Sequence, residues 1–460
     1  MRTVFLLFFS LLGVFSYFRM IGKPVLGFVI FVLPGCLAMI FMPLPQPMLS
    51  VRAARPLLLL KQKHSHQIAH AVSLLMYLVI VLLGFARSIA VGTRDFTVGV
   101  AELSIVFFTT LFFYLLVAGA RQNGSYPSIL RDLKNSLFLL MIMNVIAVLV
   151  GLRNLGIEAQ YTRSISAVFG LLDYSVLFPF TNSGRFLSIC AGVLVIIGIM
   201  DLSANKRWGD YFANCVMIGA GLAILLGHGS RVVLLGLLGV SLISLAWKPI
   251  ARRLCYWMVL VLIFIPVIYT YSDIGSAVED SANKSGLSLS RYAGEIATLS
   301  NRDAIWGSVF DEFSSFKWEH LWGYGAHGNI TSGLSVQYAT FFEGSYSQSS
   351  DMPVHNTFLQ ILVDYGYIGL SLFICILFSL LALLRKPVRL KAGIYINQQH
   401  EKTLTLILIY IVILSVTETC VTYFSLEIWS LFVFINIYAI LSPQKIVSGI
   451  SGSDNSIAKV

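Results

Sequence analysis

Apolar stretches about as long as a bilayer is thick recur along almost the whole chain, and they limit its fold more than any other feature. Backbone N–H and C=O groups cannot stay unpaired in lipid, so such stretches must form helices or a closed barrel. They are continuously apolar rather than alternating, which excludes a barrel. The composition agrees, because 57% of the residues are hydrophobic and only 12% are charged. The sequence therefore predicts an all-α, polytopic integral membrane protein.

About twelve transmembrane helices are predicted from these stretches. They are expected at about 3–18, 24–42, 69–91, 96–118, 134–152, 184–202, 211–229, 231–247, 254–271, 366–385, 403–423 and 425–442. The first is expected to be retained, because Arg19 and Met20 follow it in place of the small residues of a cleavage site. Four parts result: helices through 1–271 with a shorter outer loop at about 153–183, a large outer loop at 272–355, the last helices at 356–442, and a tail at 443–460.

The distribution of Lys and Arg predicts the orientation. With the N-terminus inside, the predicted inner segments hold 20 of the 32 basic residues and 5 of the 22 acids, a balance of +15. The rest of the chain holds 12 basic and 17 acidic residues, a balance of −5, and the two give the stated net charge of +10. The positive charge therefore reports topology and does not indicate nucleic acid as a partner. Both long loops are placed outside.

The tenth apolar stretch is too long for one membrane crossing. As a single helix, residues 356–385 would extend about 45 Å, against a hydrocarbon core of about 30 Å. The stretch also contains Asp364, Gly366 and Gly369. We therefore expect a break near Gly366, with 355–365 forming a short interfacial or re-entrant helix that begins at His355.

Arginines predicted to face outward stand out, because the large loop holds 10 acids and only 4 bases. Arg231 follows Leu-Gly-His228-Gly-Ser and lies between two apolar helices with almost no loop. A guanidinium has five fixed donors and suits a diphosphate there, whereas the alternative is a turn arginine that reaches lipid headgroups. Both interpretations stay open on charge placement alone. His228, in the same turn, is interpreted as a structural interfacial residue.

Three further residues could carry chemistry. Arg302 opens an amphipathic helix in Ser-Asn-Arg302-Asp-Ala-Ile-Trp, where a solvated arginine is the simpler interpretation. His355 ends the large loop and could act as a general base, although an isolated histidine there is more often a capping residue. Glu418 is predicted inside the membrane, where an acid is either functional or paired with an arginine. Outside the membrane the sequence has no closely spaced metal-ligand set, so no metal and no cofactor are predicted.

A motif at the end of the large loop resembles a known family. His355 and Asn356 are followed by nine residues, Gly366, two residues and Gly369. This spacing is similar to the pattern H-[NSQ]-x9-G-x-x-G of bacterial O-antigen ligases. The order of the landmarks also fits over roughly residues 150–385, since Gly-Ser-Arg231 joins two helices and Asn-Arg302-Asp opens the large loop. The wider superfamily includes O-antigen and exopolysaccharide polymerases of the same glycosyltransferase-C-like membrane architecture.

The resemblance implies metal-independent glycan transfer on the periplasmic face of the bacterial inner membrane. The donor would be a glycan on undecaprenyl diphosphate. The acceptor would be lipid A–core in lipopolysaccharide assembly, or another lipid-linked glycan in a polymerase. The essential arginines of the family correspond to Arg231 and Arg302, and through a looser match to Arg163, all as ligands of the diphosphate. Arg231 and Arg302 would also act in catalysis, with His355 as the general base.

The type of activity stays open at this point. The His-Asn motif favours a ligase. Some polymerases carry R-x10-G segments in their outer loops, and the glycine of that pattern is missing after Arg153, Arg163, Arg185, Arg291 and Arg302. Polymerases vary too much for this absence to exclude them. A transporter of polysaccharide or lipid-linked sugar is a third class, but transporters usually have related halves, which this chain lacks.

Overall fold

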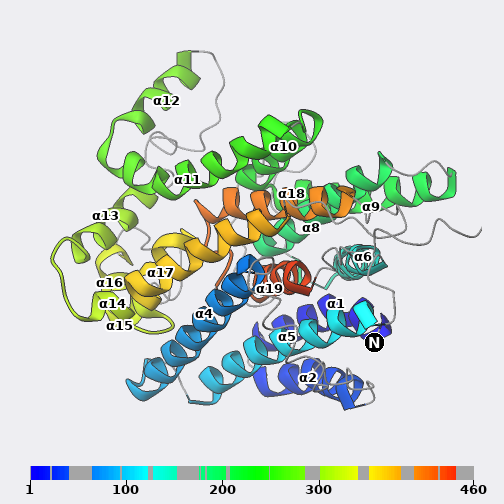
Figure 1. The fold of residues 1–460 in the computed structure, drawn as a ribbon, viewed down its shortest axis with the longest axis horizontal. Coiled ribbons are helices and arrows are strands. Elements are labelled where there is room, and N and C mark those ends of the chain that lie inside the picture. Colours follow the sequence, from blue (N-terminus) through cyan, green and yellow to red (C-terminus); the bar gives the residue numbers. More distant parts are fainter. Residues whose placement is uncertain are drawn as a thin grey trace, which may run out of the picture.

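The computed structural model describes residues 2–20, 23–40, 65–93, 96–122, 128–152, 176, 178–181, 184–203, 208–247, 249–284, 301–339, 352–384, 398–422 and 425–441. Across these ranges the regular elements are all helical, as predicted (Figure 1). The longer helices are α1 (Arg2–Met20), α2 (Pro24–Ile40), α4 (Ser65–Ala90), α5 (Phe96–Gln122), α6 (Ile129–Leu149), α8 (Gly184–Leu202), α9 (Trp208–His228), α10 (Arg231–Leu245), α11 (Pro249–Tyr271), α17 (Thr357–Leu384), α18 (Gln398–Ser415) and α19 (Leu426–Leu441).

The segment predicted as the large outer loop contributes a cap of short helices. These are α12 (Ile274–Lys284), α13 (Arg302–Glu312), α14 (Glu319–Trp322), α15 (Gly328–Thr331) and α16 (Leu334–Ala339). Figure 1 shows α13–α16 gathered at one end of the bundle, beside the first turns of α17. The cap has its own small apolar core, in which Trp306 and Tyr338 are completely buried.

Seven helices in the described ranges are long and apolar enough to cross a membrane. They cover residues 67–90, 96–121, 129–149, 185–202, 208–228, 254–271 and 357–384, and shorter apolar helices occur at 5–18, 231–245 and 426–441. The structure therefore confirms an all-α polytopic membrane protein. The count of about twelve spans stays a prediction.

Helix α19 forms the centre of the bundle. Every residue from Leu426 to Ala439 is buried, which fits a helix with few polar residues that packs on all sides. Phenylalanines pack around it, with the ring of Phe434 5.9 Å from Phe5 and 5.5 Å from Phe113. The helices around α19 turn exposed apolar side chains outward, as expected for faces that contact lipid.

Residues predicted to share the inner side do contact one another. The ammonium of Lys134 in α6 lies 2.5 Å from a carboxylate oxygen of Asp201 in α8 and 2.9 Å from the amide oxygen of Asn214 in α9. Near the start of α18, Lys402 donates to the carbonyl of Ser244 in α10 at 3.0 Å. These contacts agree with the predicted sidedness of α6, α8, α9, α10 and α18, and the orientation itself stays a prediction.

The break predicted near Gly366 is confirmed. Gly366 has φ 66° and ψ −167° inside α17, a conformation that only glycine adopts readily. A side chain there would also lack space, because a Cβ would lie 2.5 Å from Gly323 N and His320 O. The short helix before the break and the membrane helix after it are thus joined at the point where the cap approaches.

One predicted boundary was wrong. The helix expected at 403–423 ends at Ser415, so Glu418 lies in a turn after α18 and not within a helix. The apolar letters continue past Ser415, but they alternate with threonines of low helix propensity. In addition, the carbonyls of Val416, Thr417 and Glu418 accept hydrogen bonds from Asn356, Arg302 and Thr357, which replace helical hydrogen bonds.

Candidate functional site

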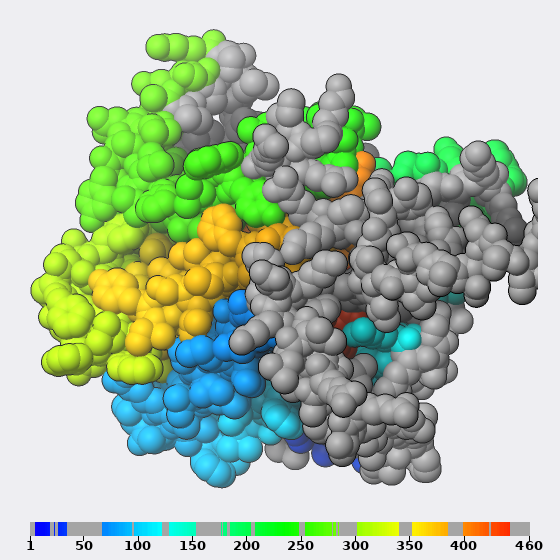
Figure 2. Space-filling model, in the orientation of Figure 1, coloured from blue at the N-terminus to red at the C-terminus, as the bar shows by residue number. Residues whose placement is uncertain are grey.

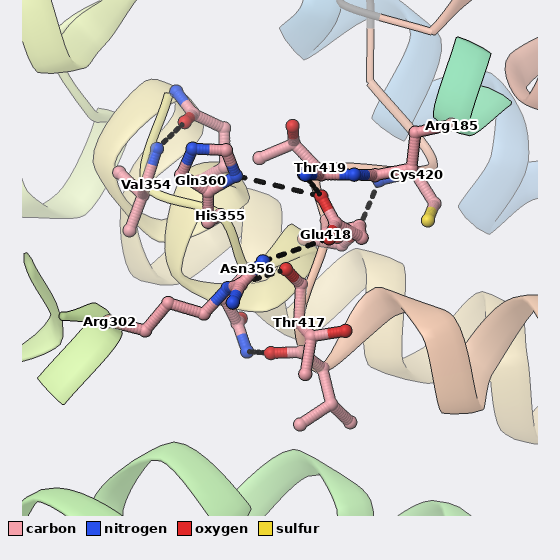
Figure 3. A network of polar contacts seen from close by, with 12 residues as sticks. Arg185, Arg302, Val354, His355, Asn356, Gln360, Thr417, Glu418, Thr419 and Cys420 are labelled. Carbon is pink, nitrogen blue, oxygen red and sulfur yellow. Dashed lines mark hydrogen bonds and ion pairs between the residues drawn. The ribbon is translucent and has the colours of Figure 1, made fainter. Parts of the chain in front are cut away.

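A carboxylate held between two arginines forms the centre of the candidate site (Figure 3). One oxygen of Glu418 accepts from Arg185 Nη1 at 2.5 Å, and the other accepts from Arg302 Nη2 at 2.9 Å. Arg302 Nε also donates to the carbonyl of Thr417 at 3.0 Å. Arg185 lies in the first turn of α8 and Arg302 begins α13, so the turn after α18 connects the membrane helices to the cap.

His355 lies against the same carboxylate. Its Nδ1 is 3.6 Å from the Glu418 oxygen that pairs with Arg185, which is longer than a hydrogen bond. That nitrogen is buried and has no hydrogen-bond partner within the described part of the chain. The backbone of His355 is left-handed, with φ 53°, an uncommon conformation for a residue other than glycine. Such residues gather at functional sites, where the surrounding structure holds them in place.

The neighbouring Asn356 and Thr357 explain why His355 is held there. Asn356 Oδ1 accepts from Leu359 N at 2.9 Å and so caps α17, while its Nδ2 donates to Val416 O at 2.7 Å. The hydroxyl of Thr357 donates to Glu418 O at 2.8 Å and accepts from Cys420 N at 2.8 Å. The start of α17 is therefore tied by side chains to the turn that carries Glu418.

Electrostatics set the charge of the cluster. Burial alone would raise the pKa of Glu418, but the guanidiniums of Arg185 and Arg302 lower it to about 2. Burial lowers the pKa of His355, and the nearby Glu418 charge only partly opposes this. At neutral pH the cluster thus holds two guanidiniums, one carboxylate and a neutral imidazole. The surplus positive charge suits an anionic ligand.

The turn at residues 322–328, with the sequence Trp-Gly-Tyr-Gly-Ala-His-Gly, docks onto the break in α17. The break frees the carbonyls of Val363 and Asp364, and Tyr324 N and Gly325 N donate to them at 2.9 Å each. The N–H of Gly328 donates to the Asp364 carboxylate at 2.7 Å. The second glycine of the motif, Gly369, packs directly beneath Tyr365, where a Cβ would overlap the tyrosine side chain. This part of the motif therefore builds the contact between the cap and α17.

The structure brings two of the predicted site residues together, since Arg302 and His355 both face Glu418. Arg231 begins α10, three residues after His228, and His228 lies within electrostatic reach of Arg185 and Glu418. Arg163 lies outside the described residues.

The sequence did not assign Arg185 to the site, and it left Glu418 as an acid that is either functional or paired with an arginine. The structure shows the pairing. The sequence signal that could have indicated Arg185 is its position at the start of an apolar helix, on the same predicted side of the membrane as Glu418. Among the described residues, no group of three His, Cys, Asp or Glu could hold a metal ion. Metal independence itself stays a prediction.

Fold and site together define a polytopic membrane protein with a buried, arginine-rich polar cluster where the cap meets the helix ends. Residues 216–374, about a third of the chain, match the family model described as O-antigen ligase. The match supports the predicted resemblance to the superfamily of O-antigen ligases and polymerases. A comparison with curated proteins found no match. The matched region includes Arg231, Arg302 and His355.

Proposed function

We propose that the chain is an O-antigen ligase, which moves a glycan from undecaprenyl diphosphate to lipid A–core on the periplasmic face of the inner membrane. The observation that carries the proposal is the pairing of Arg185 and Arg302 across the Glu418 carboxylate, with His355 beside it. The match to the O-antigen ligase family supports the reaction class.

The arginines would stabilise the leaving group. As the bond between sugar and phosphate breaks, the diphosphate gains negative charge, and guanidiniums that are already fixed in place lower the energy of that state. Glu418 binds Arg185 through one oxygen and Arg302 through the other, which keeps both cations beside the same carboxylate, where they could bind one diphosphate. Arg231 and Arg163 would add further contacts to the diphosphate.

His355 would be the general base. Its lowered pKa keeps the imidazole neutral at pH 7, so it can take the proton of the acceptor hydroxyl. The acceptor oxygen then forms the new bond to the anomeric carbon, and undecaprenyl diphosphate leaves with the electron pair of the broken bond. Glu418, 3.6 Å from Nδ1, would stabilise the imidazolium that results. The chain itself supplies these charges, so no cofactor enters the proposal.

Two alternatives are kept because the same cluster could serve them. A polymerase would use the same donor site but transfer the glycan to another lipid-linked glycan. A transporter would bind the lipid-linked diphosphate without breaking the sugar–phosphate bond. The Asn356-containing motif at the start of α17 favours the ligase.

The test incubates the purified protein, in the presence of a metal chelator, with a lipid-diphosphate-linked oligosaccharide, with and without lipid A–core. Sugar on lipid A–core only when both are present supports the ligase. Lengthening of the lipid-linked glycan without core identifies a polymerase, and no product from folded protein favours the transporter. The variants His355→Ala and Arg302→Ala should lose transfer, whereas Lys284→Ala, which removes an exposed cation from the same cap, should retain it. Full activity in both site variants would refute the mechanism.

A further inference from the structure

Three large apolar side chains lie uncovered on one short segment of the cap. Phe316, Trp318 and Trp322, between the end of α13 and the end of α14, are 64%, 75% and 58% exposed. The rings of Phe316 and Trp318 are 6.0 Å apart, and Trp322 follows Trp318 by four residues, about one helical turn. We call these three residues the aromatic foot. The cap does not expose aromatic residues in general, because Trp306 in α13 is fully buried.

The aromatic foot continues the lipid-facing surface of the membrane helices. Just before it, the ring of Phe310 lies 5.6 Å from Tyr271, and the ring of Phe313 lies 5.7 Å from Tyr367. Both tyrosines are exposed, and Tyr271 stands at the cap end of an outward apolar face. On α11 that face continues through Phe264. Figure 2 shows the cap segment at the edge of the molecule, in contact with α17.

The depth of this segment follows from the length of α17. From Tyr367 to Leu384 the helix has 18 residues after the break at Gly366, or about 27 Å, which is close to the thickness of the hydrocarbon core. With Leu384, which Arg385 follows in the sequence, at one boundary of the hydrocarbon core, this length puts Tyr367 near the other. The rings of Phe313 and His320 pack against Tyr367, so the segment that carries the foot lies beside the same boundary.

We propose that the aromatic foot inserts into the headgroup–acyl boundary of the leaflet on the cap side and anchors the cap to the bilayer. Trp and Phe suit this layer, since their large rings leave water while the indole N–H stays near polar headgroups. Attraction to anionic lipids does not drive the contact, because Asp311, Glu312 and Glu319 outnumber Lys317 in this segment. A zwitterionic phospholipid is therefore sufficient. This inference does not depend on the chemistry proposed for the site.

The experiment uses tryptophan fluorescence of the full chain in phosphatidylcholine bilayers. The variant Trp318→Phe/Trp322→Phe keeps the apolar rings, and its difference from the wild type isolates the emission of these two residues among the 7 tryptophans. That emission should be quenched by lipids with a quencher near the headgroup, less by lipids with a quencher at the chain end, and little by aqueous acrylamide. The double variant should lose the shallow-quenched component, whereas Trp306→Phe should keep it.

Each other outcome overturns the proposal. Quenching by acrylamide alone would place the foot in water. Stronger quenching at the chain ends would place it in the hydrocarbon. Quenching by none of the three would mean that protein covers it, such as a second copy. The Phe substitutions keep an aromatic ring at each position, and elution of the variant as a single folded species controls for misfolding.

Discussion

Replacing Glu418 with glutamine removes the one carboxylate that joins Arg185, Arg302 and His355 while keeping the size of the side chain. The amide oxygen of the glutamine can still accept a hydrogen bond from one guanidinium. The NH2 group of the glutamine faces the other guanidinium, and both of these groups are donors. The glutamine therefore cannot satisfy both arginines. The cluster keeps its position through the backbone of the turn, because the hydroxyl of Thr357 binds the carbonyl of residue 418 and not its side chain.

The expected loss follows from the pKa of Glu418. A fall from the usual 4.5 to about 2 corresponds to about 3 kcal/mol of stabilisation, since one pKa unit equals about 1.4 kcal/mol. Arg185 is 34% exposed, so solvent screens its share of the interaction. We therefore expect Glu418→Gln to lower the free energy of unfolding by about 2–3 kcal/mol at neutral pH. The loss of one partner from a buried ion pair costs a similar amount, about 3–5 kcal/mol.

Denaturant titration in detergent micelles at several pH values measures this loss. Because the folded state lowers the pKa of Glu418, the stabilisation is complete above about pH 4.5 and is lost as the pH falls from there towards 2. The difference between wild type and Glu418→Gln should therefore be constant from pH 7 to 5 and shrink below 4.5. Asp311→Asn, on the exposed side of α13, serves as the matched control and should change stability by less than about 0.5 kcal/mol. A difference of the same size at pH 7 and pH 3, or none at pH 7, would refute the reasoning.

Four further predictions concern α17 and the reaction. Gly366→Ala should cost more than about 3 kcal/mol, because it adds a clash with Gly323 to backbone strain, and thermal unfolding of the purified protein measures this. His355→Ala should lower kcat by about 10²–10⁴-fold with little change in donor KM, as for loss of a general base. The acid limb of the pH–rate profile should lie below pH 6.5, because the pKa of His355 is lowered. In Glu418→Gln this limb should move to a still lower pH, because the charge of Glu418 raises the pKa of His355. Arg302→Lys should weaken donor binding by about 1.5–3 kcal/mol in a titration, because an ammonium cannot reproduce the fork of the guanidinium.

Each of these has an outcome that would contradict it. Wild-type stability of Gly366→Ala would mean that the break is not needed for the cap to dock. A raised KM with unchanged kcat in His355→Ala would assign that residue to substrate binding. An acid limb above pH 6.5 would mean that Glu418 outweighs burial at His355. Unchanged donor affinity in Arg302→Lys would limit Arg302 to a structural role.

Hydropathy predicted the helices because unpaired backbone N–H and C=O groups are costly in lipid, so a long apolar stretch must form a helix there. The break at Gly366 was equally predictable, since a continuous helix would be far longer than the bilayer is thick. The end of α18 was not predictable in the same way. Val416 and Val421 keep the hydropathy high, while the helix ends because partners distant in sequence take its carbonyls. Periodicity carries no information about such partners.

The site was predictable in its residue types but not in its pairing. Arg302 and His355 follow from the motif, whereas the link from Glu418 to Arg185 spans 233 residues and depends on how α8 and α18 pack. Only the folded chain shows that one carboxylate serves both arginines. Glu418 was noticed as a costly acid in an apolar segment, and the structure supplies the reason for its presence there.

The spacing of nine residues between Asn356 and Gly366 follows from the same contacts. The short helix at 357–365 is fixed at both ends, by Asn356 and Thr357 to the turn that carries Glu418, and by the freed carbonyls of Val363 and Asp364 to the cap. One additional residue would turn the far end by about 100° and move it by about 1.5 Å. The carbonyls would then no longer meet the N–H groups of the cap while Asn356 stayed in place. The motif thus fixes the distance and the angle between the docked cap and the arginine cluster.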